Sequence, residues 1–227
     1  ADLRFETDVG AASEYMDDFD VVVASDGLNS RTRLEFADTF KPDIDQRLVK
    51  FVWLGTHQKF DDAFTFIFEK TEWGWFYAHV YQFDDNTATF IVECAQETWD
   101  KFGFEGMSKE EIVETCRAVF ADHLDGHALM SNAAHLRGSA VFMNFPRVLC
   151  ETWHHENVVL LGDASATAHF SIGSGTKLAM EDAASLVRHV AGSASVAEGL
   201  ARYQAERSVE ALKLQNAARN RMQWFED

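Results

Sequence analysis

One stretch of the sequence, residues 158–183, constrains the fold more than any other: VVLLGDASATAHFSIGSGTKLAMEDA. It predicts a hydrophobic strand that ends at Gly162-Asp163, an irregular loop, and a helix that opens at Gly173-Ser174-Gly175-Thr176. A carboxylate at the end of a strand can accept hydrogen bonds from hydroxyl groups. The free N–H groups and the positive end of a helix N-terminus attract electron-rich oxygens. The segment therefore predicts a polar cradle within a fold that mixes strands and helices.

A second polar turn follows a strand near the start of the sequence. Residues 20–24 form an apolar run, typical of a buried parallel strand, and lead into Asp26-Gly27, with Ser30 and Arg33 beyond. From Asp26 to Gly162 the two turns lie 136 residues apart. A purely structural turn with an arginine salt bridge would give the same letters, so this alternative stays open.

Together the two motifs resemble those of the single-component flavoprotein monooxygenases, the FAD-dependent aromatic-ring hydroxylase family. The resemblance implies that Asp163 binds the ribityl chain of FAD and that Gly162 and residues 173–176 approach the flavin ring. It implies that Asp26 and Gly27 lie where FAD and NAD(P)H pass, with Arg33 at the diphosphate. It also implies the reaction: NAD(P)H reduces the flavin, and O2 then gives a C4a-hydroperoxyflavin that hydroxylates an aromatic substrate.

Some residues depart from the broad family pattern and point to one branch. Ala166, Phe170 and Lys177 stand where many members have other residues. With these residues, the loop at 169–177 resembles the salicylyl-CoA and 2-aminobenzoyl-CoA hydroxylase branch, and so does the segment 64–93. The resemblance implies a small aromatic substrate, which in that branch is a CoA thioester.

Four side chains are candidates for contact with the substrate. Trp75, Tyr77 and His79 share one face of a predicted strand by period two and could line an aromatic pocket, as could Phe170 beside the flavin loop. The alternative for the strand residues is a core that packs against a helix. His169 is the catalytic candidate, against the alternative of a hydrogen-bonding scaffold.

The order of the predicted elements indicates two domains in an α/β (α+β) fold. Residues 63–69, 73–83 and 87–94 alternate as antiparallel strands, and Ser108 begins a helix with a capping box that ends at Glu111. Further strands are predicted at about 140–144 and 148–150, and helices at 174–190 and 196 to about 224. We therefore expect a discontinuous, partial Rossmann-like FAD-binding domain, residues 1–46 and 146–227, with C-terminal helices. An antiparallel-sheet substrate domain, residues 47–145, is inserted into it.

The N-terminal part of such a flavin domain is missing from the sequence. None of the 13 glycines belongs to a G-x-G-x-x-G turn, and residues 3–7 instead predict a short strand. We expect the chain to be a fragment that lacks a βαβ unit and is inactive in isolation. Its exposed face could then form a homo-oligomer. The alternative is a non-catalytic ligand-binding or interaction domain derived from the same fold.

Composition excludes several other classes of protein. The formal net charge of -17 argues against nucleic acid, and against a polyanionic substrate unless Lys and Arg gather at one mouth. No apolar run approaches the roughly 20 residues that span a bilayer. Three separated cysteines indicate reduced thiols and a cytoplasmic protein. His154-His155 lacks partners at ligand spacing, so no metal is predicted.

Overall fold

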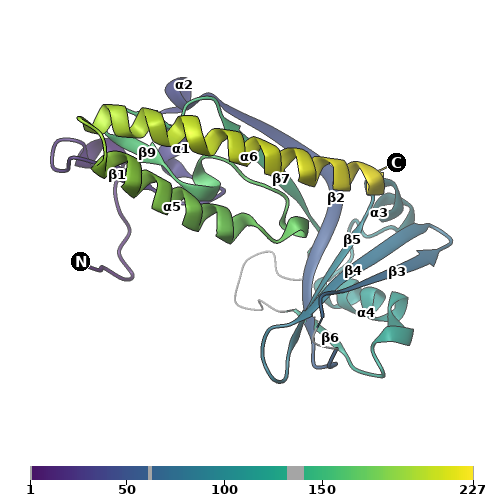
Figure 1. Ribbon diagram of the computed structural model, residues 1–227. Coiled ribbons are helices and arrows are strands. Elements are labelled where there is room, and N and C mark those ends of the chain that lie inside the picture. The colour runs from purple at the N-terminus through teal and green to yellow at the C-terminus, as the bar shows by residue number, and fades with distance from the viewer. Residues whose placement is uncertain (1, 61–62, 132–140, 227) are drawn as a thin grey trace. The chain divides into compact units, whose positions relative to one another are not determined.

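The computed structural model describes residues 2–60, 63–131 and 141–226 (Figure 1). The chain forms two compact units: unit 1 comprises Ala1–Asp45 and Pro146–Asn220, and unit 2 comprises Gln46–Phe145 and Arg221–Asp227. The predicted α/β fold, with an antiparallel sheet inserted between two parts of a parallel-strand unit, is confirmed. The assignment of cofactor and substrate roles to the two units stays a prediction.

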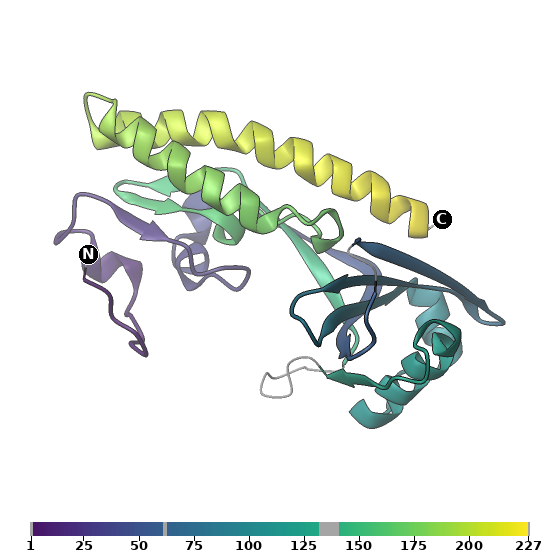
Figure 2. The same cartoon turned by 60° about the horizontal axis from the view of Figure 1, so that its bottom comes forward.

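Unit 1 contains a small sheet and two long helices. β1 (Val22–Ala24) pairs in parallel with β9 (Val158–Leu160), which pairs antiparallel with β8 (His154–His155). α5 (Gly175–Ala191) and α6 (Val196–Glu226) run side by side along it (Figure 2). The shorter elements of unit 1 are η1 (Ala12–Tyr15), α1 (Arg31–Glu35), α2 (Ala37–Phe40), η3 (Gly162–Ala164) and η4 (Phe170–Ile172).

Large side chains fill the space between this sheet and its helices. Trp153, Phe40 and Tyr203 are fully buried there, and β9 is buried along its whole length. The Tyr203 hydroxyl, on α6, donates a hydrogen bond to the Leu160 carbonyl at 3.2 Å. Because β9 ends at Leu160, this bond fixes the position at which the Gly162-Asp163 turn begins.

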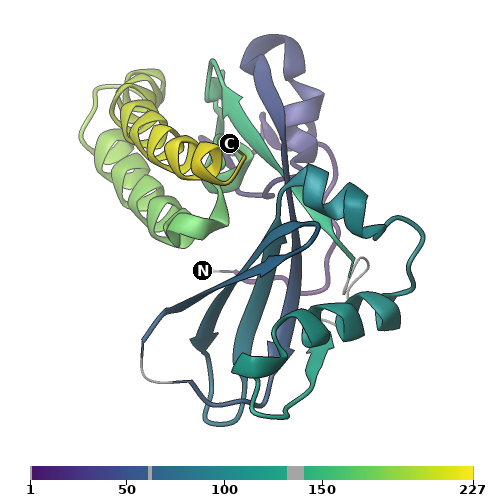
Figure 3. The same cartoon turned by 90° about the vertical axis from the view of Figure 1, so that its right-hand side faces the viewer.

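Unit 2 is an antiparallel sheet with helices on one face (Figure 3). Its strand order is β3-β4-β5-β2-β6, and β7 also pairs with β2. The strands are β2 (Pro42–Thr56), β3 (Thr65–Thr71), β4 (Gly74–Gln82), β5 (Ala88–Cys94), β6 (Leu129–Ser131) and β7 (Met143–Cys150). The helices are α3 (Gln96–Phe102), α4 (Lys109–Val119) and η2 (Ala121–His123). Phe76, Phe90 and Phe120 are fully buried between the sheet and these helices.

The capping box predicted at the start of α4 is confirmed. The Ser108 hydroxyl accepts from the Glu111 N–H at 3.2 Å, and the Glu111 carboxylate accepts from the Ser108 N–H at 2.7 Å. The two residues satisfy each other's free backbone donors, which sets the first turn of the helix.

Two predicted strands differ in the structure. Residues 3–7 do not form a strand: the backbone turns at Glu6, where φ is +51°, and Leu3 and Phe5 stay exposed. A strand needs a neighbour for its backbone hydrogen bonds, and this segment has none among the described residues. The strands predicted near 140–144 and 148–150 are one strand, β7, which begins at Met143. Ala140 lies outside the described residues.

Candidate functional site

The two polar turns lie at one edge of the unit 1 sheet. β1 and β9 are parallel and in register, with Ala24 opposite Leu160, and the Leu161 N–H donates to the Ala24 carbonyl at 2.9 Å. Asp26 and Asp163 therefore follow the carboxyl ends of adjacent parallel strands. This is the edge at which open α/β sheets bind ligands.

The Asp26 turn is held by local hydrogen bonds. The Asp26 carboxylate accepts from the Thr32 N–H at 3.1 Å, and the Ser30 hydroxyl accepts from the Arg33 N–H at 2.9 Å. Partial burial raises the pKa of Asp26, but bonds from Ser30 and from the backbone outweigh it, so its pKa is lowered. Gly27 adopts φ +79°, which a side chain would disfavour. Asp26 is therefore an exposed carboxylate in a fixed turn.

Arg33 connects the two turns from inside. Its guanidinium is buried and donates to the Ala164 carbonyl at 2.9 Å and to the Leu28 carbonyl at 2.5 Å. Its acceptors among the described residues are thus backbone carbonyls, rather than the carboxylate that the structural alternative predicted. The contact of Arg33 with a diphosphate stays a prediction.

Gly162 and Asp163 have opposite environments. Gly162 is buried with φ +63°, and a Cβ there would lie 3.1 Å from the Ala179 Cβ, so the position requires glycine. The exposed Asp163 carboxylate forms no hydrogen bond or ion pair within the described chain, and partial burial raises its pKa. Asp163 thus offers acceptor oxygens that no protein group uses.

The start of α5 offers donors beside this carboxylate. The Ser174 hydroxyl donates to the Ile172 carbonyl at 3.0 Å, so it does not cap the helix. The N–H groups of Gly175 and Thr176 lie in the first turn, where a helix has no acceptor for them. Gly162, Asp163 and Gly175 line one small cavity of about 10 Å³, which brings the two parts of the motif together.

The glycines at this helix start leave room for a ligand. Gly173 adopts φ +61°, and a Cβ added to Gly173 or Gly175 would meet no atom within 4 Å. A free carboxylate, uncapped N–H donors and bare backbone are the groups that a flavin with its ribityl chain requires. The residues present therefore fit FAD.

His169 and Phe170 precede this helix start. His169 is buried, and its ring centroid lies 4.3 Å from that of Phe170, which is partly exposed. Their catalytic and substrate-binding roles stay predictions. Trp75, Tyr77 and His79 belong to unit 2.

These three residues lie on the sheet face opposite the phenylalanine core. Tyr77 and His79 are buried, whereas Trp75 is 56% exposed, with the Lys70 ammonium 5.6 Å from its ring centroid. Other aromatic rings cover the buried pair: Phe66 lies edge-on to His79, and Phe68 stacks on Tyr77. We call this surface the aromatic face: Phe64, Phe66, Phe68, Trp75, Tyr77, His79 and Tyr81.

A buried carboxylate, which the sequence analysis did not predict as a site residue, contacts this aromatic face. Glu93 is directly opposite Tyr77 in the register of β4 and β5 and is fully buried. It accepts a hydrogen bond from the Tyr77 hydroxyl, and its second oxygen lies 2.8 Å from Nε2 of His79. The signal was present: Glu93 is the single charged residue in the run 87–94.

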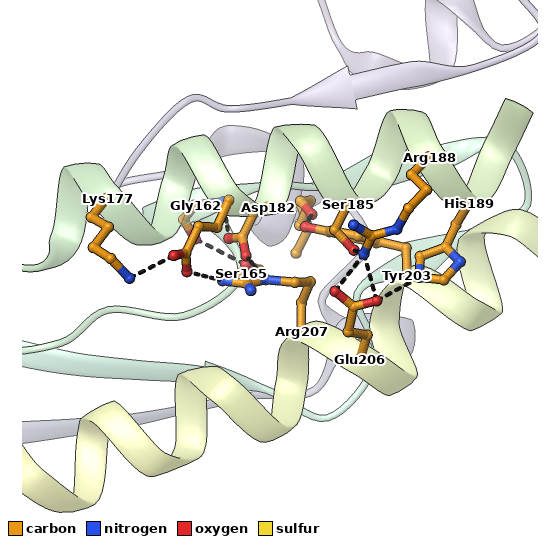
Figure 4. A network of polar contacts seen from close by, with 12 residues as sticks. Gly162, Ser165, Lys177, Asp182, Ser185, Arg188, His189, Tyr203, Glu206 and Arg207 are labelled. Atoms are coloured by element: carbon orange, nitrogen blue, oxygen red, sulfur yellow. Dashed lines mark hydrogen bonds and ion pairs between the residues drawn. The ribbon is translucent and has the colours of Figure 1, made fainter.

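A second missed group lies between α5 and α6 (Figure 4). The buried Asp182 carboxylate accepts from Nε of Arg207 at 2.6 Å and from the Gly162 N–H at 3.3 Å. Asp182 also lines the small cavity beside Asp163. A charged residue on the apolar side of a predicted helix was the only sequence signal.

Two further observations concern a membrane and a metal ion. No helix of the described residues is long and apolar enough to cross a membrane. Within the same residues, no group of three or more His, Cys, Asp or Glu side chains is placed to hold a metal ion.

Comparisons with known proteins agree with this geometry. The family described as FAD binding domain matches residues 18–218. Salicyloyl-CoA 5-hydroxylase of a Streptomyces species is 39% identical over 233 residues, which cover 99% of this chain and 44% of that protein. Protodeoxyviolaceinate monooxygenase of Chromobacterium violaceum is 35% identical over 226 residues, covering 99% of this chain and 58% of that protein.

A solved structure has the same fold. The tetrameric form of 2-methyl-3-hydroxypyridine-5-carboxylic acid oxygenase matches with a TM-score of 0.66 and 18% identity, over 88% of this chain and 52% of that one. The chain thus spans about half the length of the proteins it matches. The resemblance seen in the sequence is confirmed: the chain belongs to the FAD binding domain family of the FAD-dependent monooxygenases.

Proposed function

We propose that this chain is part of an FAD-dependent monooxygenase that hydroxylates a small aromatic substrate with NAD(P)H and O2. One observation carries the proposal: the ends of β1 and β9 bring Asp26, Asp163 and the start of α5 to a single edge of the sheet. Bound flavin would supply the electron transfer and the oxygen chemistry, which no side chain of the protein can perform.

The residues of unit 1 would bind and orient the flavin. The Asp163 carboxylate would accept hydrogen bonds from ribityl hydroxyls, since no protein donor occupies it. The N–H groups of Gly175 and Thr176 would donate to the electron-rich edge of the ring. The positive end of the α5 dipole would favour negative charge on the reduced flavin there. Asp26 and Gly27 would border the path of FAD and NAD(P)H.

The aromatic face of unit 2 would bind the substrate. Its exposed ring, Trp75, offers stacking area, and the buried pair Tyr77 and His79 gives the face polar atoms. Phe170, and His169 as a proton-transfer group, would act from the flavin loop. The matched relatives include a hydroxylase named for salicyloyl-CoA, so we propose an aromatic ring, with an aromatic acyl-CoA as the specific candidate.

An open sheet edge supports the proposal of a further βαβ unit in the natural polypeptide. β1 is an edge strand of a parallel pair, and Val23 on it is 47% exposed. A cavity of about 380 Å³ runs beside β1; apolar residues such as Val9 and Val22 line part of it, and polar residues such as Asp26 and Glu35 line the rest. Parallel sheets are normally covered and paired, so this edge fits another strand of the same protein.

The test is flavin binding by the natural polypeptide that carries this chain. Asp163→Ala should abolish co-purification of FAD, while Asp18→Ala, an exposed carboxylate of the same unit, should leave it unchanged. Flavin retained by Asp163→Ala at the wild-type level would remove Asp163 from the site. If the wild-type polypeptide binds no FAD, the non-catalytic ligand-binding domain becomes the better proposal.

A further inference from the structure

We infer that Asp182 and Arg207 are positioning residues that hold the Gly162-Asp163 turn in the shape that binds flavin. This inference rests on the proposed function. It concerns two residues outside the cofactor-binding set named above, and it begins from the hydrogen bonds of Gly162.

Both polar groups of Gly162 are held. Its N–H donates to Asp182 at 3.3 Å, and its carbonyl accepts from the Ser165 N–H and hydroxyl, each at 2.9 Å. With φ at +63° and Ala179 against the Cα, the residue has little room to rotate. The N–H of Gly162 belongs to its peptide with Leu161, and the carbonyl belongs to its peptide with Asp163. The two peptides on either side of Gly162 together set the direction in which the Asp163 side chain leaves.

The acceptor of the Gly162 N–H is itself held by a cation. Asp182 and Arg207 are each 5% exposed, and their side chains meet at 2.6 Å. Arg207 also donates to Glu181 at 3.2 Å, and Glu181 is paired with Lys177 at 2.5 Å (Figure 4). A buried carboxylate keeps its charge only where a partner offsets its desolvation, so Arg207 secures the acceptor that Gly162 uses.

A second ion pair between the same two helices serves as the matched control. Arg188 on α5 donates to Glu206 on α6 at 2.6 Å, and Glu206 also lies 2.8 Å from His189. These groups are exposed or half-buried, and none of them contacts Gly162. If FAD binding depended only on the pairing of α5 with α6, removing either ion pair would weaken FAD binding equally.

The experiment uses double variants of the natural polypeptide, with the FAD dissociation constant and the melting temperature of the apoprotein as readouts. Asp182→Leu/Arg207→Met replaces the buried pair with apolar groups of similar size, which often preserves stability, but leaves the Gly162 N–H without its acceptor. We expect FAD binding to weaken by about tenfold, which is about 1.4 kcal/mol, because the turn no longer holds Asp163 in one orientation before FAD binds. Asp182→Asn/Arg207→Met keeps an acceptor oxygen and should recover most of that loss.

The control Arg188→Met/Glu206→Gln should leave FAD binding unchanged. Wild-type affinity in a folded Asp182→Leu/Arg207→Met protein would overturn the inference, as would equal losses in both apolar and amide variants. If the apolar variant does not fold, Asp182→Ala/Arg207→Gln decides: it also removes the acceptor of the Gly162 N–H without leaving a buried charge, so unchanged affinity would also overturn the inference. Failure of wild type to bind FAD would instead contradict the proposed function.

Discussion

Two carboxylates are buried in the described part of the chain, and their surroundings differ. Asp182 in unit 1 faces a guanidinium and a glycine N–H, whereas Glu93 in unit 2 faces a phenol and an imidazole. The first set fixes a piece of backbone, and the second fixes side chains of the aromatic face. The same kind of group, a buried carboxyl, therefore orders a loop in one unit and a surface in the other.

The largest expected effect is on stability, where removal of Asp182 should cost more than removal of Glu93. Asp182→Ala removes the buried partner of Arg207, which keeps the partly exposed Glu181 at 3.2 Å, and should lower the free energy of unfolding by about 3 kcal/mol. Glu93→Ala leaves groups that can be neutral, and the expected loss is about 1–3 kcal/mol. Urea denaturation of each variant measures both values. An equal or reversed order would show that the two sites do not differ in this way.

The next test concerns the pH dependence of flavin binding. Burial raises the pKa of Asp163, and its ionised form accepts hydrogen bonds more strongly and at both oxygens, whereas protonation turns one oxygen into a donor. As pH falls through this raised pKa, protonation should weaken FAD binding by up to about tenfold per pH unit. Binding titrations across pH should show this slope in wild type and not in Asp163→Asn. The same slope in both proteins would assign the titration to another group.

A third prediction concerns Trp75, the exposed ring of the aromatic face in unit 2. Because the ring is mostly exposed, Trp75→Ala should change the free energy of unfolding by less than about 0.5 kcal/mol, yet raise KM for the aromatic substrate several-fold. Trp73→Ala is the control, since its ring packs on Phe102 of α3, 4.6 Å between centroids, on the helix side. Trp73→Ala should lower stability without raising KM. Steady-state kinetics that show the opposite pattern would place the substrate elsewhere.

The smallest expected effect tests how burial changes the contribution of a Glu–His pair to stability. Glu69 pairs with His123 at 2.6 Å near the surface, as Glu93 pairs with His79 at 2.8 Å in the interior. Glu69→Gln should cost about 0–1 kcal/mol, and Glu93→Gln should cost more, since its partners have no water to replace the carboxylate. Denaturation curves for the two variants test this ranking, and coincident curves would contradict it.

The positions of strands and helices could be predicted from the sequence better than the pairing between strands. Alternation located β3, β4 and β5, and local chemistry located the first turn of α4, because these features depend on neighbouring residues. Residues 3–7 have a strand's pattern but not a strand's neighbour, so that prediction was wrong. A pattern can show what a segment could pair with, but pairing is decided by chain that lies elsewhere.

The candidate site divides in the same way. Asp163 and the glycines of its motif could be identified from their local spacing. Arg33 could not be placed, because its acceptor, the Ala164 carbonyl, belongs to the other motif. Burial of Glu93 and of Asp182 arises from strands and helices that close over them, which no short stretch of sequence records.

The parallel pairing of β1 with β9 also has a consequence for how the protein is made. Val22 meets Val158 only after the whole antiparallel sheet of unit 2 has been synthesised between them. On the ribosome, the strands of that sheet can pair while the edge of β1 that will receive β9 is still unpaired. We expect β1 to stay exposed on that edge, and so available to a chaperone, until β9 has been synthesised.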